Sequence, residues 1–121
     1  MTTTYDFAFC TKYRFQVLQP SMSAEITRMV SAVATTFGSS VQKVNYELDF
    51  VHIQANVNAN VSPVDLLASF KGSLSFGLQK EYPSVKNTYY GKAMFDRDFF
   101  AVTTGTTQGT LDAWKLLHPV G

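Results

Sequence analysis

The chain contains only two histidines, His52 and His118, and both lie in patterns that could support metal or phosphoryl chemistry. His52 follows Asp49 and Phe50 in a run rich in β-forming residues. His118 lies four residues after Trp114, so an α-helix there would place both side chains on one face. Two imidazoles can share a zinc or manganese ion, but two ligands alone make a poor site. A hydrogen-bonded, partly buried His52 is therefore the simpler interpretation.

Other reactive side chains are better explained by structure than by catalysis. Tyr89 and Tyr90 carry hydroxyl nucleophiles, but we expect them to pack or to stack. Cys10 has no second cysteine nearby and is expected to be a small buried thiol. Asp96 and Asp98 could bind a cation, although solvated loop charges are the default. No phosphate-binding glycine loop, zinc-ligand spacing or serine-centred catalytic motif occurs in the sequence.

Length and composition predict one domain that spans residues 1–121. The chain is 45% apolar and 14% aromatic, which is enough for a real core. Ten lysine and arginine residues stand against nine aspartate and glutamate residues, so the formal net charge is only +1. Bulk basicity therefore gives no indication of a nucleic-acid partner, and any such binding must rest on a local patch.

The sequence predicts a soluble protein of the reducing cytoplasm. Cys10 is the single cysteine, so no intrachain disulfide can form. The first four residues lack the charged region and apolar core of a signal peptide. No apolar run approaches the roughly 18 to 20 residues that span a bilayer, and no membrane association is expected.

The first half of the chain predicts a strand, a helix and a hairpin. Large and small side chains alternate from Tyr5 to Tyr13, which is typical of a strand with two unlike faces. Apolar residues at helical spacing between Pro20 and Phe37 predict a helix, which the following glycine would end. The β-rich runs Val41–Leu48 and Val51–Val57 then predict a hairpin.

The second half predicts a longer helix, a strand and a short terminal helix. Ser62 and Pro63 are typical of a helix start, and this helix should end before Pro83. Gly72 and Gly77 destabilise it by about 1 kcal/mol each, which indicates close packing or a nearby ligand at both, with packing the preferred explanation. An irregular connection over 89–97, a strand over 99–104 and a helix over 108–117 complete the order. The expected fold is an α+β, ferredoxin-like βαββαβ domain with a four-stranded antiparallel sheet, two packed helices and a short C-terminal helix.

Five short motifs occur in a fixed order along the chain. They are Cys10-Thr11-Lys12-Tyr13-Arg14, Asp49-Phe50-Val51-His52-Ile53, Lys71-Gly72-Ser73, Tyr82-Pro83 and Phe95-Asp96-Arg97-Asp98-Phe99-Phe100. Each is weak alone, but together they resemble the small single-tyrosine, HUH-type transposases that mobilise hairpin-ended insertion sequences. The resemblance runs from about residue 5 to residue 118 and agrees with the fold expected from the residue pattern.

The resemblance implies a reaction centre in which two positions are replaced. In the family, two histidines one residue apart on a strand hold a divalent metal, and a helix-borne tyrosine attacks the phosphate of single-stranded DNA. Phe50 stands in the place of the first histidine, and His52 in that of the second. Trp114 stands in the tyrosine position, where an indole cannot act as a nucleophile. His118 takes the place of a polar ligand, so a remnant site for Mg²⁺, Mn²⁺ or Zn²⁺ would use His52 and His118, although no cofactor is the main expectation.

Loss of a metal ligand together with the nucleophile predicts a transposase-like protein that binds nucleic acid without cutting it. The expected partner is single-stranded or stem-loop DNA or RNA. The residues expected to contact phosphates are Lys12, Arg14, Lys71, Lys86, Lys92 and Arg97. The residues expected to stack on unpaired bases are Tyr13, Tyr89 and Tyr90. The resemblance also implies a homodimer formed by association of the two sheets.

Two other functions remain open. One is a metal-dependent single-strand nuclease or transposase with an altered site, in which His52, His118 and a carboxylate hold a metal that activates water. The other is a protein-interaction module, which the near-neutral charge supports. Cleavage of single strands with manganese would favour the first, and recovery of a specific protein partner would favour the second.

Overall fold

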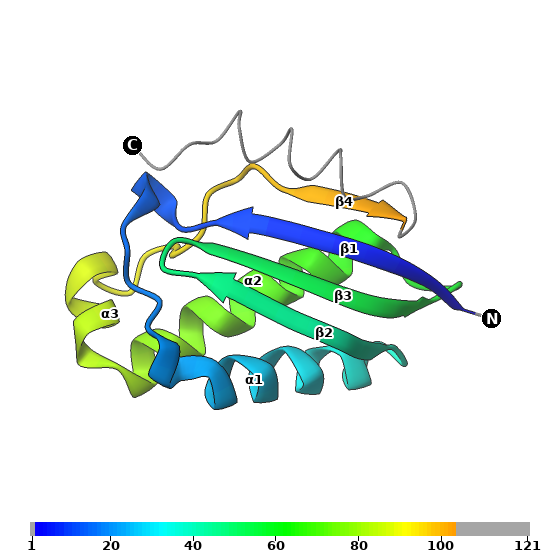
Figure 1. Cartoon of the computed structure of the whole chain (residues 1–121), viewed down its shortest axis with the longest axis horizontal. Coiled ribbons are helices and arrows are strands. Elements are labelled where there is room, and N and C mark those ends of the chain that lie inside the picture. Colours follow the sequence, from blue (N-terminus) through cyan, green and yellow to red (C-terminus); the bar gives the residue numbers. More distant parts are fainter. Residues whose placement is uncertain (1, 104–121) are drawn as a thin grey trace.

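A four-stranded antiparallel sheet with helices against one face forms the framework of the chain (Figure 1). The computed structural model describes residues 2–103. Its elements are β1 (Thr2–Cys10), α1 (Ser23–Thr36), β2 (Ser40–Glu47), β3 (Phe50–Asn58), α2 (Pro63–Glu81), α3 (Pro83–Tyr89) and β4 (Phe100–Thr103), with 3₁₀ turns at Lys12–Arg14 and Pro20–Met22. The strand order is β2-β3-β1-β4, so the expected α+β, ferredoxin-like arrangement is confirmed. The helix expected over 108–117 lies outside the described residues.

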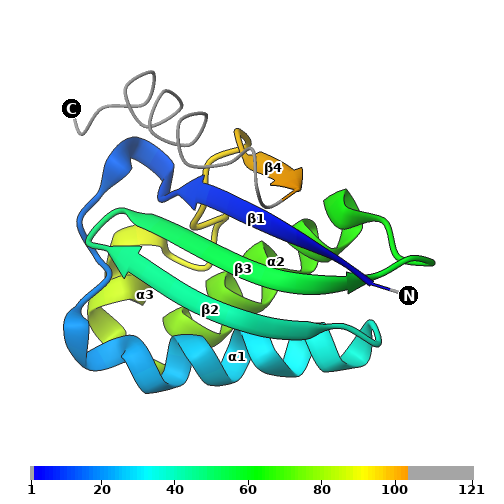
Figure 2. The same cartoon turned by 45° about the vertical axis from the view of Figure 1, so that its right-hand side comes forward.

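The main core lies between the sheet and the two long helices. Figure 2 shows these helices on one face of the sheet from a second side. Phe7 and Phe9 on β1 and Ile53 on β3 point into this core, where they meet fully buried side chains of α1 and α2 such as Ile26 and Phe70. Side chains alternate along a strand, so the residues between them face the other side of the sheet. That second face carries a smaller apolar cluster, described with the candidate site below. Within residues 2–103, no helix is long and apolar enough to cross a membrane.

Strand β1 ends three residues earlier than the alternating pattern predicts. It stops at Cys10, and Tyr13 has a φ of 63° while Arg14 has a φ of 54°. These values belong to the left-handed region, outside the range of regular strands. The alternating pattern predicted too long a strand, because Tyr13 is an aromatic residue of the kind that strands favour. Its ring in fact points into solvent.

Helix α2 begins as its sequence predicts. The Ser62 hydroxyl accepts a hydrogen bond from the backbone N–H of Asp65 at 3.3 Å, and Pro63 occupies the first helical position. The two glycines of this helix differ in their surroundings. A Cβ at Gly77 would lie 2.7 Å from the end of the Met29 side chain on α1, which confirms the expected close packing there. A Cβ at Gly72 would meet nothing within 4 Å, so the expectation of packing at Gly72 is wrong.

Residues 83–89 form a helix, α3, that was not predicted from the sequence. Pro83 ends α2, and it is also the first residue of α3, where its missing N–H costs nothing. Val85 and Tyr89 lie one turn apart and are both buried against the rest of the molecule. Tyr90, with a φ of 53°, and Gly91, with a φ of 81°, end the helix. The irregular connection expected over 89–97 therefore begins only after α3.

Candidate nucleic-acid interface

Phe50 and His52 lie on β3 and face the side of the sheet away from α1 and α2. Phe50 pairs with Cys10 on β1 and is only 4% exposed. Its ring belongs to an apolar cluster with Ala8, Cys10 and Phe100. The position that the resemblance assigns to a metal-binding histidine is thus occupied by a buried phenyl ring, which offers no lone pair.

One ring nitrogen of His52 already has a partner within the protein. Its Nε2 lies 2.7 Å from Oδ1 of Asp6, a carboxylate that is 2% exposed, and the Gln54 amide also donates to this oxygen at 3.4 Å. Among residues 2–103, no group of three or more His, Cys, Asp or Glu side chains is placed to hold a metal ion. Of the two histidines expected to hold a metal, only His52 lies within this stretch. Trp114 and His118 lie outside the described residues.

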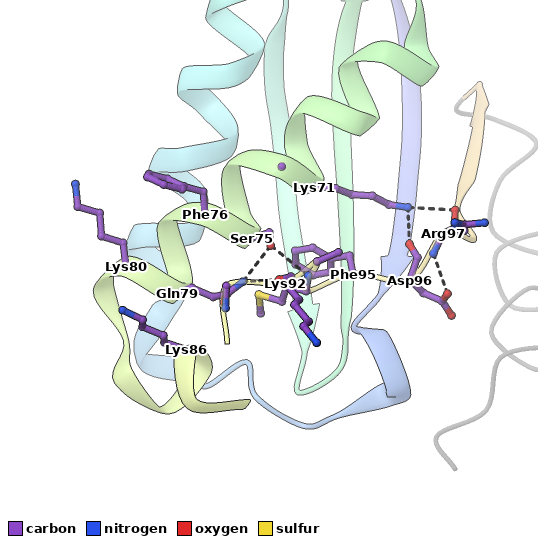
Figure 3. Close-up of a pocket in the computed structure, with 14 residues that line it drawn as sticks. Lys71, Ser75, Phe76, Gln79, Lys80, Lys86, Lys92, Phe95, Asp96 and Arg97 are labelled. Atoms are coloured by element: carbon purple, nitrogen blue, oxygen red, sulfur yellow. Dashed lines mark hydrogen bonds between the residues drawn. The ribbon is translucent and has the colours of Figure 1, made fainter. Parts of the chain in front are cut away.

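A groove of about 770 Å³ runs between α2 and the segment 91–97 (Figure 3). Among residues 2–103, its lining includes five of the ten lysine and arginine residues of the chain and a single carboxylate, that of Asp96. The basic residues are Lys71, Lys80, Lys86, Lys92 and Arg97. Half of the positive side chains thus gather in one hollow of a chain whose net charge is only +1. Such a local concentration is the electrostatic property that a phosphate backbone requires.

Two polar side chains of α2, those of Ser75 and Gln79, hold the segment 91–94 in place, which forms the wall of the groove opposite the helix. Gln79 donates to the Ser75 hydroxyl at 3.2 Å and to the Lys92 carbonyl at 2.9 Å, while its own carbonyl accepts from the Gly91 N–H at 2.7 Å. Ser75 also accepts from the Met94 N–H at 3.2 Å. Since Gln79 is buried and uses both ends of its amide, the segment that carries Lys92 has a fixed position against the helix.

Lys71 serves the groove in a different way from the other four cations. Its ammonium donates to the backbone carbonyls of Asp96 at 2.8 Å, and of Arg97 and Asp98 at 3.4 Å each. It also lies 5.6 Å from the centre of the Phe99 ring. Burial lowers the pKa of this ammonium, and the negative charges of Asp96 and Asp98 partly oppose that effect. Lys71 therefore fixes the 96–98 segment, while Lys80, Lys86, Lys92 and Arg97 are exposed.

The turn after β1 lies on the other side of the same segment. The Lys12 N–H donates to the carbonyl of Met94 at 2.8 Å, and the Asp96 N–H donates to the carbonyl of Cys10 at 2.9 Å. Met94 and Asp96 both line the groove. The groove and the turn that carries Lys12, Tyr13 and Arg14 are therefore joined by backbone hydrogen bonds.

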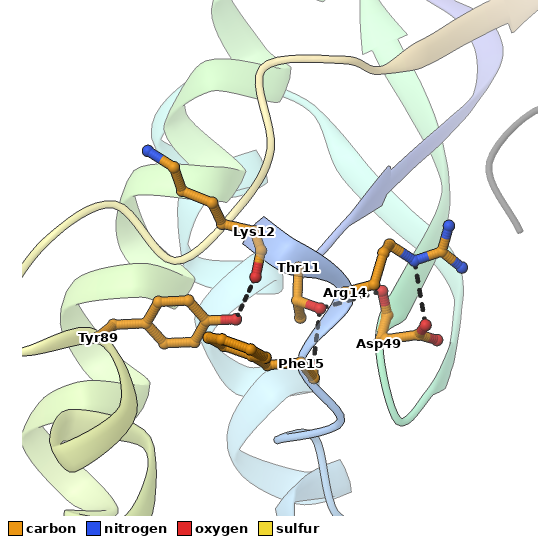
Figure 4. Close-up of polar contacts among 6 residues, drawn as sticks. All are labelled: Thr11, Lys12, Arg14, Phe15, Asp49 and Tyr89. Atoms are coloured by element: carbon orange, nitrogen blue, oxygen red, sulfur yellow. Dashed lines mark hydrogen bonds and ion pairs between the residues drawn. The ribbon is translucent and has the colours of Figure 1, made fainter. Parts of the chain in front are cut away.

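Several contacts hold this turn in its unusual conformation (Figure 4). The Arg14 guanidinium lies 3.0 Å from the buried Asp49 carboxylate, and the Thr11 hydroxyl donates to the Phe15 carbonyl at 2.8 Å. The Tyr89 hydroxyl donates to the Lys12 carbonyl at 2.9 Å. Left-handed backbone at a non-glycine residue costs about 1–3 kcal/mol. Tyr13 and Arg14 both adopt it, so the surrounding contacts must offset this cost at two residues.

The three tyrosines expected to stack on bases have different environments. Tyr89 is 4% exposed, and burial raises the pKa of its hydroxyl, so this ring packs inside the protein and is not available to a base. Tyr13 is 70% exposed and Tyr90 is 78% exposed. The Tyr13 ring lies 5.5 Å from that of Phe15, which in turn lies 5.9 Å from that of Tyr89.

The structure brings most of the sequence-predicted residues to one region. Lys71, Lys86, Lys92 and Arg97 share the groove, and Lys12, Tyr13 and Arg14 share the adjoining turn. Two lining residues were not predicted from the sequence: Lys80, and Phe76, whose aromatic side chain is 73% exposed. Residues 72, 76 and 80 follow one another at four-residue spacing, on the side of α2 opposite its buried stripe. A helical projection of α2 would have found both.

A family model of IS200-like transposases matches residues 1–115 of the chain. The chain belongs to this family. A crystal structure of a proposed transposase from Deinococcus radiodurans R1 is similar, with a TM-score of 0.86 and 18% identity over 100% of this chain and 94% of that chain. A REP-associated tyrosine transposase bound to a REP hairpin has a TM-score of 0.61 and 9% identity over 98% of this chain and 70% of that chain. No curated protein sequence matches the chain.

Membership of the IS200-like transposase family places the chain in a class of enzymes. Structural likenesses at 18% and 9% identity establish the fold alone. The groove and its charges are features of this chain's own residues.

Proposed function

We propose that this IS200-like transposase binds single-stranded or hairpin nucleic acid without cutting it. The observation that carries the proposal is the groove between α2 and the segment 91–97, where five cations stand against one carboxylate. A phosphate backbone releases counterions when such side chains neutralise it, and that release drives binding. A structurally similar transposase is bound to a REP hairpin, which supports a nucleic acid as the partner of this fold.

The absence of cutting follows from the residues at the family's reaction centre. Phe50 cannot coordinate a metal, and Trp114 cannot form a covalent link to a phosphate. His52 contributes its Nε2 to a contact with Asp6. The groove needs neither a metal nor a nucleophile to hold phosphates.

Salt-dependent binding tests the proposal directly. A labelled stem-loop with a single-stranded flank should bind the protein, and log K should fall linearly with log salt. The variant Lys86→Gln/Lys92→Gln removes two exposed groove cations and should flatten that slope by about 0.7 to 0.9 per lost phosphate contact. Lys43→Gln is the matched control, because Lys43 is an exposed lysine on β2 that does not line the groove. Absence of binding at low salt, or equal effects of both variants, would refute the proposal.

A metal-dependent nuclease is the second candidate, because His52 lies beside a buried carboxylate, that of Asp6. Together with His118, these groups would be the remaining donors for an ion that activates water. Incubation of the protein with labelled single strands and Mn²⁺ distinguishes the two functions. Cleavage that disappears in His52→Ala would favour the nuclease, and intact strands that remain bound would favour the binding protein.

We also propose that the protein is a homodimer joined through its sheets, as the family resemblance implies. Within residues 2–103, β2 and β4 are the edge strands available for such pairing. Static light scattering measures the assembly directly. A monomer at micromolar concentration would contradict this part of the proposal, and recovery of a specific protein partner without nucleic acid would favour the interaction-module alternative.

A further inference from the structure

Tyr13 and Tyr90 each combine an exposed aromatic ring with a backbone in the left-handed region. Non-glycine residues in this region are uncommon, and where they persist the surrounding contacts determine them. At Tyr13 the turn projects a large apolar ring into water, although burial of that ring would be favourable. Such an arrangement points to a ligand that covers the ring.

The Tyr13 ring is held more firmly than the Tyr90 ring. It lies 5.5 Å from Phe15, which packs on the buried Tyr89, so three aromatic rings follow one another from the core to the surface. The Lys12 ammonium lies 5.7 Å from the centre of the Tyr13 ring. Among residues 2–103, Tyr90 has neither a ring partner nor a lysine over its ring.

The Tyr13 turn is also coupled to the groove. The Lys12 N–H is bonded to the carbonyl of Met94, which lines the groove, and the Asp96 N–H is bonded to the carbonyl of Cys10 at the end of β1. In Figure 4, Lys12 and Arg14 leave the turn on opposite sides, and Arg14 is directed to Asp49. Lys12 is thus the cation beside the ring, while Arg14 holds the turn.

We propose that Tyr13 stacks on an unpaired base of a nucleic acid whose phosphates lie in the groove, with Lys12 contacting the phosphate beside that base. A paired base has both faces covered by its neighbours, so a side-chain ring can stack only on a base that has left the helix. The ligand is therefore single-stranded where it passes the turn. This inference rests on the proposed function, and it selects a single strand over a continuous duplex.

The variant Tyr13→Gly tests the inference without damaging the fold. Glycine accepts a φ of 63° at no steric cost, so the variant should melt at or above the wild-type temperature. Binding is measured with two probes, an oligo(dT) strand and a blunt duplex of equal length. We expect Tyr13→Gly to lose roughly 5- to 100-fold in affinity for the strand and to bind the duplex as the wild type does. Tyr13→Phe keeps the ring and should bind like the wild type.

The matched control is Tyr90→Gly, which removes an equally exposed ring from the same backbone region. It should leave the affinity for the strand unchanged. A strand carrying 2-aminopurine gives an independent readout, since stacking on Tyr13 should quench its fluorescence in the wild type and not in Tyr13→Gly.

The outcomes separate this inference from the proposed function. Equal affinities of wild type and Tyr13→Gly for the strand, or equal losses in Tyr13→Gly and Tyr90→Gly, would overturn the stacking role and leave the groove as the binding site. Failure of the wild type to bind either probe at low salt would overturn the proposed function and the inference together.

Discussion

The imidazole of His52 and the carboxylate of Asp6 are in hydrogen-bond contact across β3 and β1, with 2.7 Å between Nε2 and Oδ1. The residue opposite His52 on β1 is Ala8, so the contact runs diagonally between the strands. Asp6 is nearly inaccessible to water, and a buried carboxylate without partners would be costly. His52 is therefore one of the groups, with the Gln54 amide, that contact this buried carboxylate.

A histidine at position 50, where the family resemblance implies one, should create a metal-dependent gain in stability. Phe50→His places two imidazoles one residue apart on one face of β3. Without metal, the variant should lose about 1–3 kcal/mol, because a polar ring replaces a buried phenyl ring. Mn²⁺ or Zn²⁺ should then raise its melting temperature more than that of the wild type.

Phe50→Leu is the control for this metal experiment, since it removes the phenyl ring without adding a ligand. Thermal unfolding of the three proteins with and without metal gives the comparison. If Phe50→His and Phe50→Leu respond equally to metal, position 50 does not belong to a metal site.

The glycines of α2 should respond in opposite ways to alanine. Gly72→Ala should stabilise the protein by about 0.5–1 kcal/mol, because alanine favours a helix and a Cβ there would meet no neighbour within 4 Å. Gly77→Ala gains the same propensity but would press on Met29, with only 2.7 Å available, so it should be neutral or destabilising. Urea unfolding measures both, and a stabilised Gly77→Ala would show that Met29 moves aside freely.

The fold was predictable in outline because each long element has a clear pattern of its own. Ser62 and the buried stripe of α2 are local signals, and the structure confirms them. The end of β1 was not predictable, because the residues on either side of Tyr13 are held by distant partners, Arg14 by Asp49 and Lys12 by Tyr89. Helix α3 was not predicted, because Pro83 both ends α2 and begins the next helix.

The sequence predicted several residues of the candidate site, but not their arrangement in space. Lys86, Lys92 and Arg97 could be nominated as single positive charges, but their meeting in one groove depends on the packing of the 91–97 segment against α2. The role of Lys71 is likewise tertiary, since its three carbonyl partners lie 25 to 27 residues away. Sequence pattern alone contains no signal for such a contact.

Alkaline pH should destabilise the fold through Cys10. Burial raises the pKa of this thiol from 9.0 to about 11, although the charge of Arg14 partly opposes the effect. The folded state therefore holds the proton more tightly than the unfolded chain does. The resulting stability is fully present below pH 9 and is lost as the pH rises from 9 towards 11.

The variant Cys10→Ala isolates this thiol from the tyrosines and lysines that titrate in the same range. The difference in the free energy of unfolding between wild type and Cys10→Ala should shrink as the pH rises from 9 towards 11, the window that the two pKa values define. Iodoacetamide should also modify the native thiol much more slowly than the urea-unfolded one. A difference that stays constant with pH would contradict the raised pKa.

Lys71 should separate stability from binding among the groove cations. Lys71→Met keeps an apolar stem but leaves the carbonyls of residues 96–98 without their ammonium donor, so it should cost about 1–3 kcal/mol of stability. Lys86→Gln alters an exposed side chain and should change stability by less than about 0.5 kcal/mol, while it weakens nucleic-acid binding. Urea unfolding and fluorescence anisotropy on the same preparations test both statements. If Lys71→Met proved as stable as Lys86→Gln, the 96–98 segment would not depend on the ammonium, and Lys71 would have to be counted with the cations that contact phosphate.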